Sequence, residues 1–236
     1  MSTSLSQHTV RPVLPIDVVS DVVCPWCFIG KHRLETALAM RPDIDTEVRW
    51  RAYFLNPWIP RAGIDRSSYV KTKFGSVERY QAIAQRVVVA AAAEGLSYSL
   101  DRINRQPNTL DCHRLILWAR TSRAADRVKQ RLMELYFSEG ADLTDPEVLV
   151  SAAADAGMDS QLVRQLLATD ADEERVATEA NVAKNAGFDG VPYFIFGNVL
   201  AVAGAQDPSY LADALGRAAL EYARRNQSEI VSAPSD

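Results

Sequence analysis

The sequence predicts an α/β fold in which a block of helices interrupts a small sheet. Two short β-branched runs near the N-terminus flank a helix-periodic stretch, and the middle of the chain carries only helical patterns. Two further apolar runs near the C-terminus flank Gly197-Asn198. With 236 residues, of which 47% are hydrophobic, the chain is long enough to bury a substantial core. We therefore expect a globular protein built as one domain that carries an insertion.

The first predicted unit is a strand, a helix and a second strand. Residues 13–20, VLPIDVVS, form an apolar run that Asp21 breaks, as is typical of a buried strand ending in a loop. Residues 28–38 then place apolar side chains at helical spacing, with charged residues between them. Residues 45–55 alternate apolar and polar side chains, which is the pattern of a second strand. This order of elements predicts a parallel βαβ unit.

Residues 59–171 form a block in which every periodic stretch is helical. Helix starts carry the expected residues, with Ser76 before one periodic run and Asp145-Pro146 before another. No fixed period of about 20 to 50 residues recurs, so the block is not a repeat array. The sequence therefore predicts an all-helical insertion.

The C-terminal part is predicted to form a helix, a hairpin and a last helix. A helix over residues 172–186 leads into two apolar runs around Gly197-Asn198, a dipeptide typical of tight hairpin turns. The last helix starts at Asp207, and the polar stretch from Asn226 onward is expected to fray. Without the insertion, the elements are strand, helix, strand, helix, hairpin and helix, which is a thioredoxin-like layout. The expected parts are a first thioredoxin-like segment, the helical insertion and a second thioredoxin-like segment with a frayed tail, at residues 1–58, 59–171 and 172–236.

Composition and charge exclude several classes of function. The net charge is −4 and no basic block is interleaved with aromatic residues, so the sequence does not predict a nucleic-acid partner. The longest run of small apolar residues, 87–93, is far shorter than the roughly 20 residues that a membrane-spanning helix needs. The N-terminal segment does not resemble a secretory signal, which favours a cytoplasmic location. Three cysteines are too few for a disulfide framework in a reducing compartment.

A cysteine pair, C-P-W-C at residues 24–27, lies where the first strand ends and the first helix begins. Such a pair can bind zinc, form a structural bridge or exchange disulfides. A closed zinc site needs two further ligands, and the candidates Cys112 and His113 are adjacent, which points them about 100° apart on a helix. Exchange chemistry is therefore favoured over zinc binding.

The position of the pair predicts which sulfur reacts first. A helix N-terminus offers unpaired backbone N–H groups and the positive end of the macrodipole, which favour thiolate over thiol at Cys24. Cys27 lies one turn further along the same face, from which it can attack a mixed disulfide, and Pro25 suits the first helical turn. The sequence therefore predicts Cys24 as the attacking sulfur and Cys27 as the resolving sulfur.

Four motifs together resemble one known family: D-V-V-C-P-W-C-F-I-G-K, N-T-L-D-C-H-R-L, G-V-P-Y-F-I-F and A-G-A-Q, in this order. They are similar to the DsbA-like thiol-disulfide oxidoreductases, in particular to a cytoplasmic FrnE-like branch, over roughly residues 13–225. The resemblance implies a thioredoxin fold with a helical insertion after the second strand. It also implies that Pro192 is cis and faces the cysteine pair. Val191 would then offer its backbone groups to an extended substrate.

Six residues are candidates for substrate binding: Pro25, Trp26, Asn56, Asn108, His113 and Val191. Some have equally plain structural explanations. Asn108, like its neighbour Thr109, is expected first as a helix cap. The resemblance suggests that the helix of His113 covers the active site, whereas the plain alternative is a capping or solvated helix histidine.

Aromatic residues after the second strand are a further candidate surface. Tyr53, Phe54 and Trp58 either form an apolar lip for substrates together with Asn56 and Trp26 or pack at the strand end. Cys112 has helical spacing with neighbouring apolar residues, which favours core packing over a redox role.

Three functions fit these observations to different degrees. The first is a thiol-disulfide oxidoreductase, a reductase or isomerase of protein or small-molecule disulfides, with no resident cofactor and with glutathione as a candidate co-substrate. The second is a glutathione-dependent enzyme of the kappa glutathione transferase and 2-hydroxychromene-2-carboxylate isomerase type. The resemblance gives that group a serine at the first cysteine position and no second cysteine, so the presence of Cys24 and Cys27 favours exchange. The third, a binding or metal-holding module, rests on the pair alone. We expect a monomer or homodimer.

Overall fold

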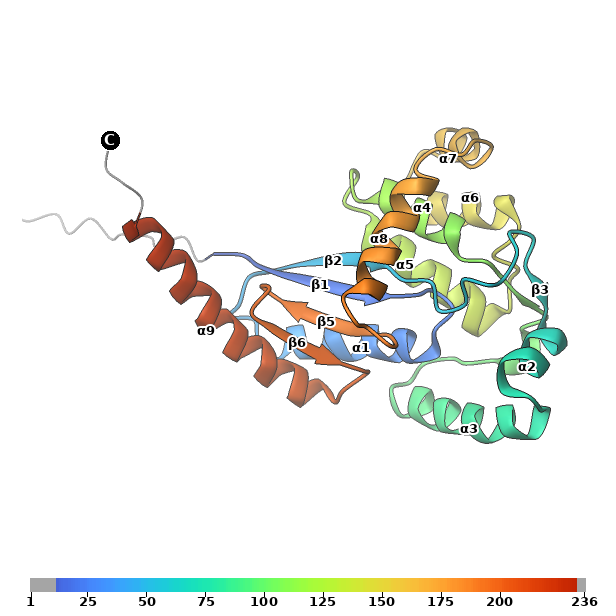
Figure 1. The fold of residues 1–236 in the computed structure, drawn as a ribbon, viewed down its shortest axis with the longest axis horizontal. Helices are drawn as coiled ribbons and strands as arrows, with labels where there is room; N and C mark the ends of the chain where they lie inside the picture. The colour runs from blue at the N-terminus through green and yellow to red at the C-terminus, as the bar shows by residue number, and fades with distance from the viewer. Residues whose placement is uncertain (1–11, 233–236) are drawn as a thin grey trace, which may run out of the picture.

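The computed structural model describes residues 12–232, and its centre is a four-stranded sheet (Figure 1). The strands lie in the order β2-β1-β5-β6. Their bounds are Leu14–Ser20 for β1, Thr46–Ala52 for β2, Tyr193–Phe196 for β5 and Leu200–Ala203 for β6. β1 and β2 are parallel, whereas β5 is antiparallel to both of its neighbours. The predicted βαβ unit and hairpin are both confirmed, and together they give the thioredoxin-like sheet.

Helices bury β1 at the centre of this sheet. Helices α1 (Pro25–Ala39) and α9 (Pro208–Ser232) pack against each other below the sheet in Figure 1, while α8 (Glu173–Asn185) packs against β2. As a result, the side chains of Ile16 and Val18 are almost completely buried. An unbroken β-branched run is the pattern expected of a strand that is covered in this way.

The turn of the C-terminal hairpin has the geometry that its sequence predicts. Gly197 and Asn198 have φ angles of 58° and 55°, in the left-handed region that glycine and asparagine adopt most readily. A Cβ atom on Gly197 would lie 2.7 Å from the Leu14 side chain. Glycine is therefore required at this position both by the backbone conformation and by the close approach of β1.

The insertion between β2 and α8 is mostly helical. Its helices are α2 (Arg66–Phe74), α3 (Val77–Ala93), α4 (Leu110–Ala119), α5 (Ala125–Glu134), α6 (Pro146–Asp155) and α7 (Ser160–Leu167), with a 3₁₀ turn at Leu100–Arg102 and a π-helical turn at Leu135–Glu139. Ser76 and Asp145 cap α3 and α6 through their side chains, as predicted. None of the helices in the described part of the chain combines the length and the apolar character that a bilayer crossing requires.

Two features of the fold correct the sequence-based expectations. The insertion is not all-helical, because β3 (Ile64–Asp65) and β4 (Arg105–Gln106) pair as a two-stranded antiparallel sheet. Strands of two residues carry no alternation that a sequence pattern could reveal. The chain also does not fray at Asn226, since α9 continues to Ser232. No glycine or proline interrupts the sequence between these residues, and the first helix breaker is Pro234, outside the described residues.

Candidate active site

The cysteine pair occupies the start of α1. β1 ends at Ser20, and Cys24 is the N-cap residue of the helix, with φ and ψ of −90° and 114° and no side-chain capping bond. The backbone N–H of Cys24 donates to the Asp21 carbonyl oxygen at 3.4 Å, and the N–H of Cys27 donates to the Cys24 carbonyl oxygen at 3.0 Å. This geometry places Cys24 at the head of the helix and Cys27 one turn inside it, as the sequence predicts.

The two thiols are free, buried and electrostatically different. The Cys24 side chain is 4% exposed and that of Cys27 is 1% exposed. A hydrogen bond from the Cys27 thiol lowers the pKa of Cys24, with smaller help from the backbone of Cys27 and Trp26 and against the effect of burial. Burial raises the pKa of Cys27 well above its ordinary value. The helix N-terminus alone predicts this asymmetry, but the Cys27 thiol lowers the pKa of Cys24 more than the first-turn backbone does.

The loop before β5 closes over Cys24. The Val191–Pro192 peptide bond is cis, as the resemblance implies, and the Cys24 sulfur lies 3.5 Å from the Val191 carbonyl oxygen. Pro192 is buried, and a Cβ atom on Gly30 would lie 2.9 Å from its ring. Glycine at position 30 thus allows α1 to pack directly against this loop, which holds the Val191 carbonyl at the reactive sulfur.

A buried acid lies three residues before the first cysteine of the pair. Asp21 is completely buried; one carboxylate oxygen accepts the Leu55 backbone N–H at 2.8 Å and the other lies 3.3 Å from the His113 Nε2 atom. Burial alone would raise the pKa of Asp21, but the hydrogen bond and charge of His113 lower it below its ordinary value. His113, 4% exposed, therefore contacts Asp21 from α4 and does not line the surface.

Exposed aromatic side chains mark the outer side of the site. Trp26 is 37% exposed and Trp58 is 46% exposed, and the Trp58 ring stacks on Tyr69 with centroids 6.2 Å apart.

Asn56 is buried and its Oδ1 atom accepts a hydrogen bond from Lys73 at 2.5 Å. Burial lowers the pKa of Lys73, while the nearby charge of Cys24 opposes that shift. A lysine amine therefore lies within electrostatic reach of the attacking sulfur.

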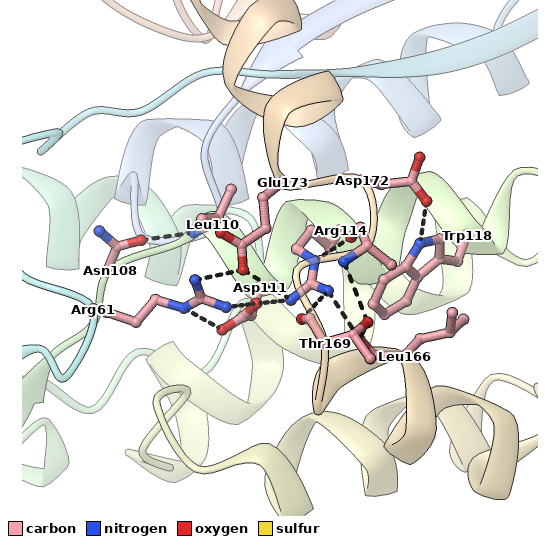
Figure 2. A network of polar contacts seen from close by, with 11 residues as sticks. Arg61, Asn108, Leu110, Asp111, Arg114, Trp118, Leu166, Thr169, Asp172 and Glu173 are labelled. Atoms are coloured by element: carbon pink, nitrogen blue, oxygen red, sulfur yellow. Dashed lines mark hydrogen bonds and ion pairs between the residues drawn. The ribbon is translucent and has the colours of Figure 1, made fainter.

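The N-T-L-D-C-H-R-L motif forms a structural network (Figure 2). The Asn108 side chain donates to the Ile59 carbonyl oxygen at 2.7 Å and accepts the Leu110 N–H at 2.9 Å, so both of its polar ends are bonded within the chain. Arg114 is completely buried. Its guanidinium donates to Asp111 and to the carbonyl oxygens of residues 166, 169 and 171. These bonds fix α4 to the segment that links α7 and α8.

Three buried charged residues have roles that the sequence motifs do not predict. The sequence indicates Asp21 only as the end of a strand and Arg114 only as part of a motif. The third, Lys129, is 1% exposed and lies at helical spacing between Ala125 and Leu132, on the apolar face of α5. A lysine on an apolar stripe is a usable signal, because charged side chains are almost never fully buried without a partner. Cys112 is completely buried, consistent with core packing.

Among the described side chains, no group of three or more histidine, cysteine, aspartate or glutamate residues is arranged to hold a metal ion.

Known structures share this architecture. A probable DsbA oxidoreductase from Streptomyces coelicolor is 33% identical, with a TM-score of 0.79 over 87% of this chain and 89% of that chain. The cytosolic disulfide reductase DsbM from Pseudomonas aeruginosa, also solved with GSH, is 15% identical, with a TM-score of 0.59 over 90% of this chain and 98% of that chain. A 2-hydroxychromene-2-carboxylate isomerase is 17% identical, with a TM-score of 0.64 over 93% of this chain and 100% of that chain.

The family assignment rests on most of the chain. Residues 15–216 match the family described as DSBA-like thioredoxin domain, a span that runs from β1 into α9 and includes the insertion. The DsbM and isomerase structures are only 15% and 17% identical to this chain, so their likeness shows the fold alone. The Streptomyces coelicolor structure is similar in both sequence and fold. The chain therefore belongs to the DSBA-like thioredoxin domain family.

Proposed function

We propose that this chain is a thiol-disulfide oxidoreductase that exchanges disulfides through Cys24 and Cys27. The observation that carries the proposal is the asymmetry of the pair: the pKa of Cys24 is lowered at the helix head, and the pKa of the deeper Cys27 is raised by burial. A thiolate is the nucleophile in disulfide exchange, so the first sulfur is the one better prepared to attack. The second remains a thiol until a mixed disulfide has formed beside it.

The reaction proceeds in two exchanges. The Cys24 thiolate attacks one sulfur of a substrate disulfide, forms a mixed disulfide and releases the other sulfur as a thiolate. Cys27 then loses its proton and attacks the Cys24 sulfur, which releases the second substrate thiolate and leaves a Cys24–Cys27 disulfide. The enzyme cysteines lose two electrons and the substrate disulfide gains them. Glutathione or another thiol returns the pair to the dithiol by the reverse steps.

The substrate approaches Cys24 from the loop of Val191. An extended peptide can pair with the backbone of Val191, whose carbonyl oxygen is already 3.5 Å from the sulfur. Pro25 and the exposed Trp26 flank the sulfur on α1, and Asn56 with Lys73 contributes polar groups. Asn108 and His113 are bonded inside the protein, so their proposed contribution is to hold this surface in place.

The proposal extends to a reductase or isomerase of the FrnE-like branch that acts in the cytoplasm. Three free cysteines in 236 residues fit a chain that does not depend on structural disulfides. A cytosolic glutathione poise of roughly −220 to −320 mV reduces the more oxidising active-site pairs, so the dithiol is the expected resting state. The fold shared with DsbM, solved with GSH, supports glutathione as the co-substrate.

One observation favours a second candidate function. The fold also matches a 2-hydroxychromene-2-carboxylate isomerase, which fits a glutathione-dependent isomerase or transferase. The two functions differ in their need for Cys27. Reduction of a protein disulfide uses both sulfurs, whereas activation of glutathione for attack on a non-disulfide substrate does not require a resolving cysteine.

The test compares wild-type protein with the Cys27→Ala variant in two assays with glutathione. We expect wild-type protein to catalyse the reduction of insulin disulfides, and we expect Cys27→Ala to lose most of this activity because mixed disulfides are no longer resolved from within the protein. The second assay measures isomerisation of 2-hydroxychromene-2-carboxylate. Isomerase activity that survives in Cys27→Ala, together with no insulin reduction by the wild-type protein, would replace the proposed function by the second candidate.

A further inference from the structure

A cavity of about 550 Å³ lies along the outer edge of β2. β2 is an edge strand, because it pairs with β1 on one side only. The facing wall belongs to the insertion: it comes from the residues that link α4 to α5 and from the start of α5. The volume falls within the range of about 300 to 1,000 Å³ that is usual for small-molecule sites. The lining is separate from the cysteine pair and consists of Glu47, Val48, Arg49, Trp50, Arg51, Arg120, Arg123, Ala125 and Asp126.

Positive charge dominates this lining. Four of the lining residues are arginines and two are acids, although the whole chain has a net charge of −4. Arg49 and Arg51 lie two residues apart on β2, so their side chains leave the same face of the strand. A guanidinium is planar and presents N–H groups in pairs that match the oxygen atoms of a carboxylate or a phosphate. The cavity therefore has the composition of an anion site.

Three of the four guanidiniums bind one carboxylate each and keep further donors. The pairs are Arg49 with Glu47, Arg51 with Asp17, and Arg120 with Glu179. In the hydrogen bonds of the described residues, Arg51 uses its Nε atom alone. The Nε atom of Arg120 is buried and has no hydrogen-bond partner there. A buried donor without an acceptor is unfavourable, so a ligand rich in acceptor oxygens would satisfy groups that the protein leaves unpaired.

Arg123 is the fourth guanidinium, and it has no acid of its own. Within the described part of the chain, none of the carboxylates lies at ion-pair distance from it, and the two acids of the cavity are engaged elsewhere. Glu47 binds Arg49, and Asp126 binds Lys31 at 3.2 Å. Arg123 thus adds an uncompensated positive charge to the cavity.

Arg123 also lies where the end of a helix favours glycine. The backbone N–H of Ala124 donates to the Ala119 carbonyl oxygen at 2.9 Å, and that of Arg123 donates to the Arg120 carbonyl oxygen at 3.2 Å. These two bonds form the motif in which a left-handed residue, usually glycine, ends a helix. Arg123 has a φ of 56° in this place, which is unfavourable for a residue with a Cβ atom. Because glycine would end the helix at a lower cost, the arginine side chain indicates a second use.

We propose that this cavity binds a small phosphorylated molecule through Arg123 and the unused donors of Arg49, Arg51 and Arg120. Three of these guanidiniums already hold a carboxylate, so a ligand gains from the remaining donors only if it carries more charge and more acceptors than another carboxylate. A phosphate group does so, with about −1.5 to −2 charge at neutral pH and three acceptor oxygens. Binding at this site does not depend on exchange through the cysteine pair.

The test is a calorimetric titration of the full chain with pyrophosphate, repeated with citrate. Pyrophosphate supplies phosphate groups alone, whereas citrate supplies a similar negative charge as carboxylates. The proteins compared are wild type, Arg123→Gly, Glu47→Gln, Cys24→Ser and Arg164→Gln. The last is the matched control, because it removes one arginine charge from an exposed ion pair on α7, outside the cavity.

We expect wild-type protein to bind pyrophosphate more tightly than citrate. Arg123→Gly should weaken pyrophosphate binding by about tenfold or more, because a hydrogen bond to a charged group contributes at least that factor. Its fold should be kept, since glycine is preferred at this left-handed position. Glu47→Gln should tighten binding, because it removes a negative charge and releases N–H groups of Arg49. Arg164→Gln and Cys24→Ser should bind like wild-type protein.

The opposite results would overturn the proposal. If wild-type protein takes up no pyrophosphate, the cavity is not a phosphate site. An unchanged affinity in Arg123→Gly would place the ligand elsewhere, and an equal loss in Arg164→Gln would mean that only the overall charge matters. Citrate that binds as tightly as pyrophosphate would exclude the preference for phosphate. Loss of binding in Cys24→Ser would locate the ligand at the cysteine pair.

Discussion

The Cys24→Ser variant is expected to fold normally and to lose disulfide exchange. Cys24 is the N-cap residue of α1, and serine is among the preferred residues there, so the helix start should keep its stability. Its hydroxyl does not form a nucleophilic anion at neutral pH. The Cys27 sulfur, 1% exposed and with a raised pKa, cannot replace it. Because enzymes typically accelerate reactions by at least about 10⁶-fold, activity should fall by three or more orders of magnitude.

The Cys27→Ser variant supplies the complementary result. With the resolving sulfur removed, the reaction should stop after the first exchange and leave substrate or glutathione bound to Cys24, which intact-mass analysis detects as an adduct that reductant removes. The Cys24→Ser variant should carry no such adduct under the same conditions. An adduct on Cys27 of the Cys24→Ser protein, with retained insulin reduction, would show that the order of attack is reversed.

Arg114→Met is expected to give the largest loss of stability without touching a sulfur. The guanidinium is completely buried, and its removal takes one donor from each of three carbonyl oxygens and from the Asp111 carboxylate, which Arg61 still binds (Figure 2). Breaking a buried charged pair by removing one partner costs about 3 to 5 kcal/mol. Denaturant unfolding of the wild-type and variant proteins measures this difference, and methionine keeps much of the apolar packing against Trp118.

Arg61→Met is the matched control for this prediction. Arg61 contacts Asp111 and Glu173 in the same network, but its side chain is 46% exposed. Ion pairs at the surface contribute about 0 to 1 kcal/mol, so this variant should lose no more than that. Equal losses for the two arginines would mean that Arg114 does not anchor α4 to the segment before α8.

The sheet was predictable because its signals are local. The β-branched run of β1, the alternation of β2 and the Gly197-Asn198 turn each fit within a few residues, and their order fixes the βαβ unit and the hairpin. β3 and β4 could not be found in this way. Each has two residues, and they pair across some forty residues of chain, so only the tertiary structure brings Ile64 opposite Gln106.

The sequence predicts the reacting residues of the candidate site but not the groups that set their pKa values. The sequence places Cys24 and Cys27 at a helix head, and the motif resemblance adds Pro192. The groups that tune these sulfurs come from other elements, Asp21 from the turn after β1 and Lys129 from α5. The pKa of Cys27 is set by its burial, which depends on how the insertion packs on α1. No spacing of residues in the sequence indicates how deeply the Cys27 side chain is buried.

The most direct test of the account is the reduction potential of the Cys24–Cys27 pair as a function of pH. Wild-type protein is equilibrated in buffers with a series of ratios of reduced to oxidised glutathione. The samples are quenched with acid and alkylated, and intact-mass analysis then gives the reduced fraction. We expect one two-electron transition that involves Cys24 and Cys27 and leaves Cys112 a thiol. Above the lowered pKa of Cys24 and below the raised pKa of Cys27, reduction takes up one proton, so the potential should fall by roughly 30 mV per pH unit. Below the pKa of Cys24, two protons are taken up and the slope should double to roughly 60 mV. The absence of a reversible two-electron transition at this pair, or one slope of roughly 60 mV up to the pKa of a free cysteine near 8.5, would contradict it.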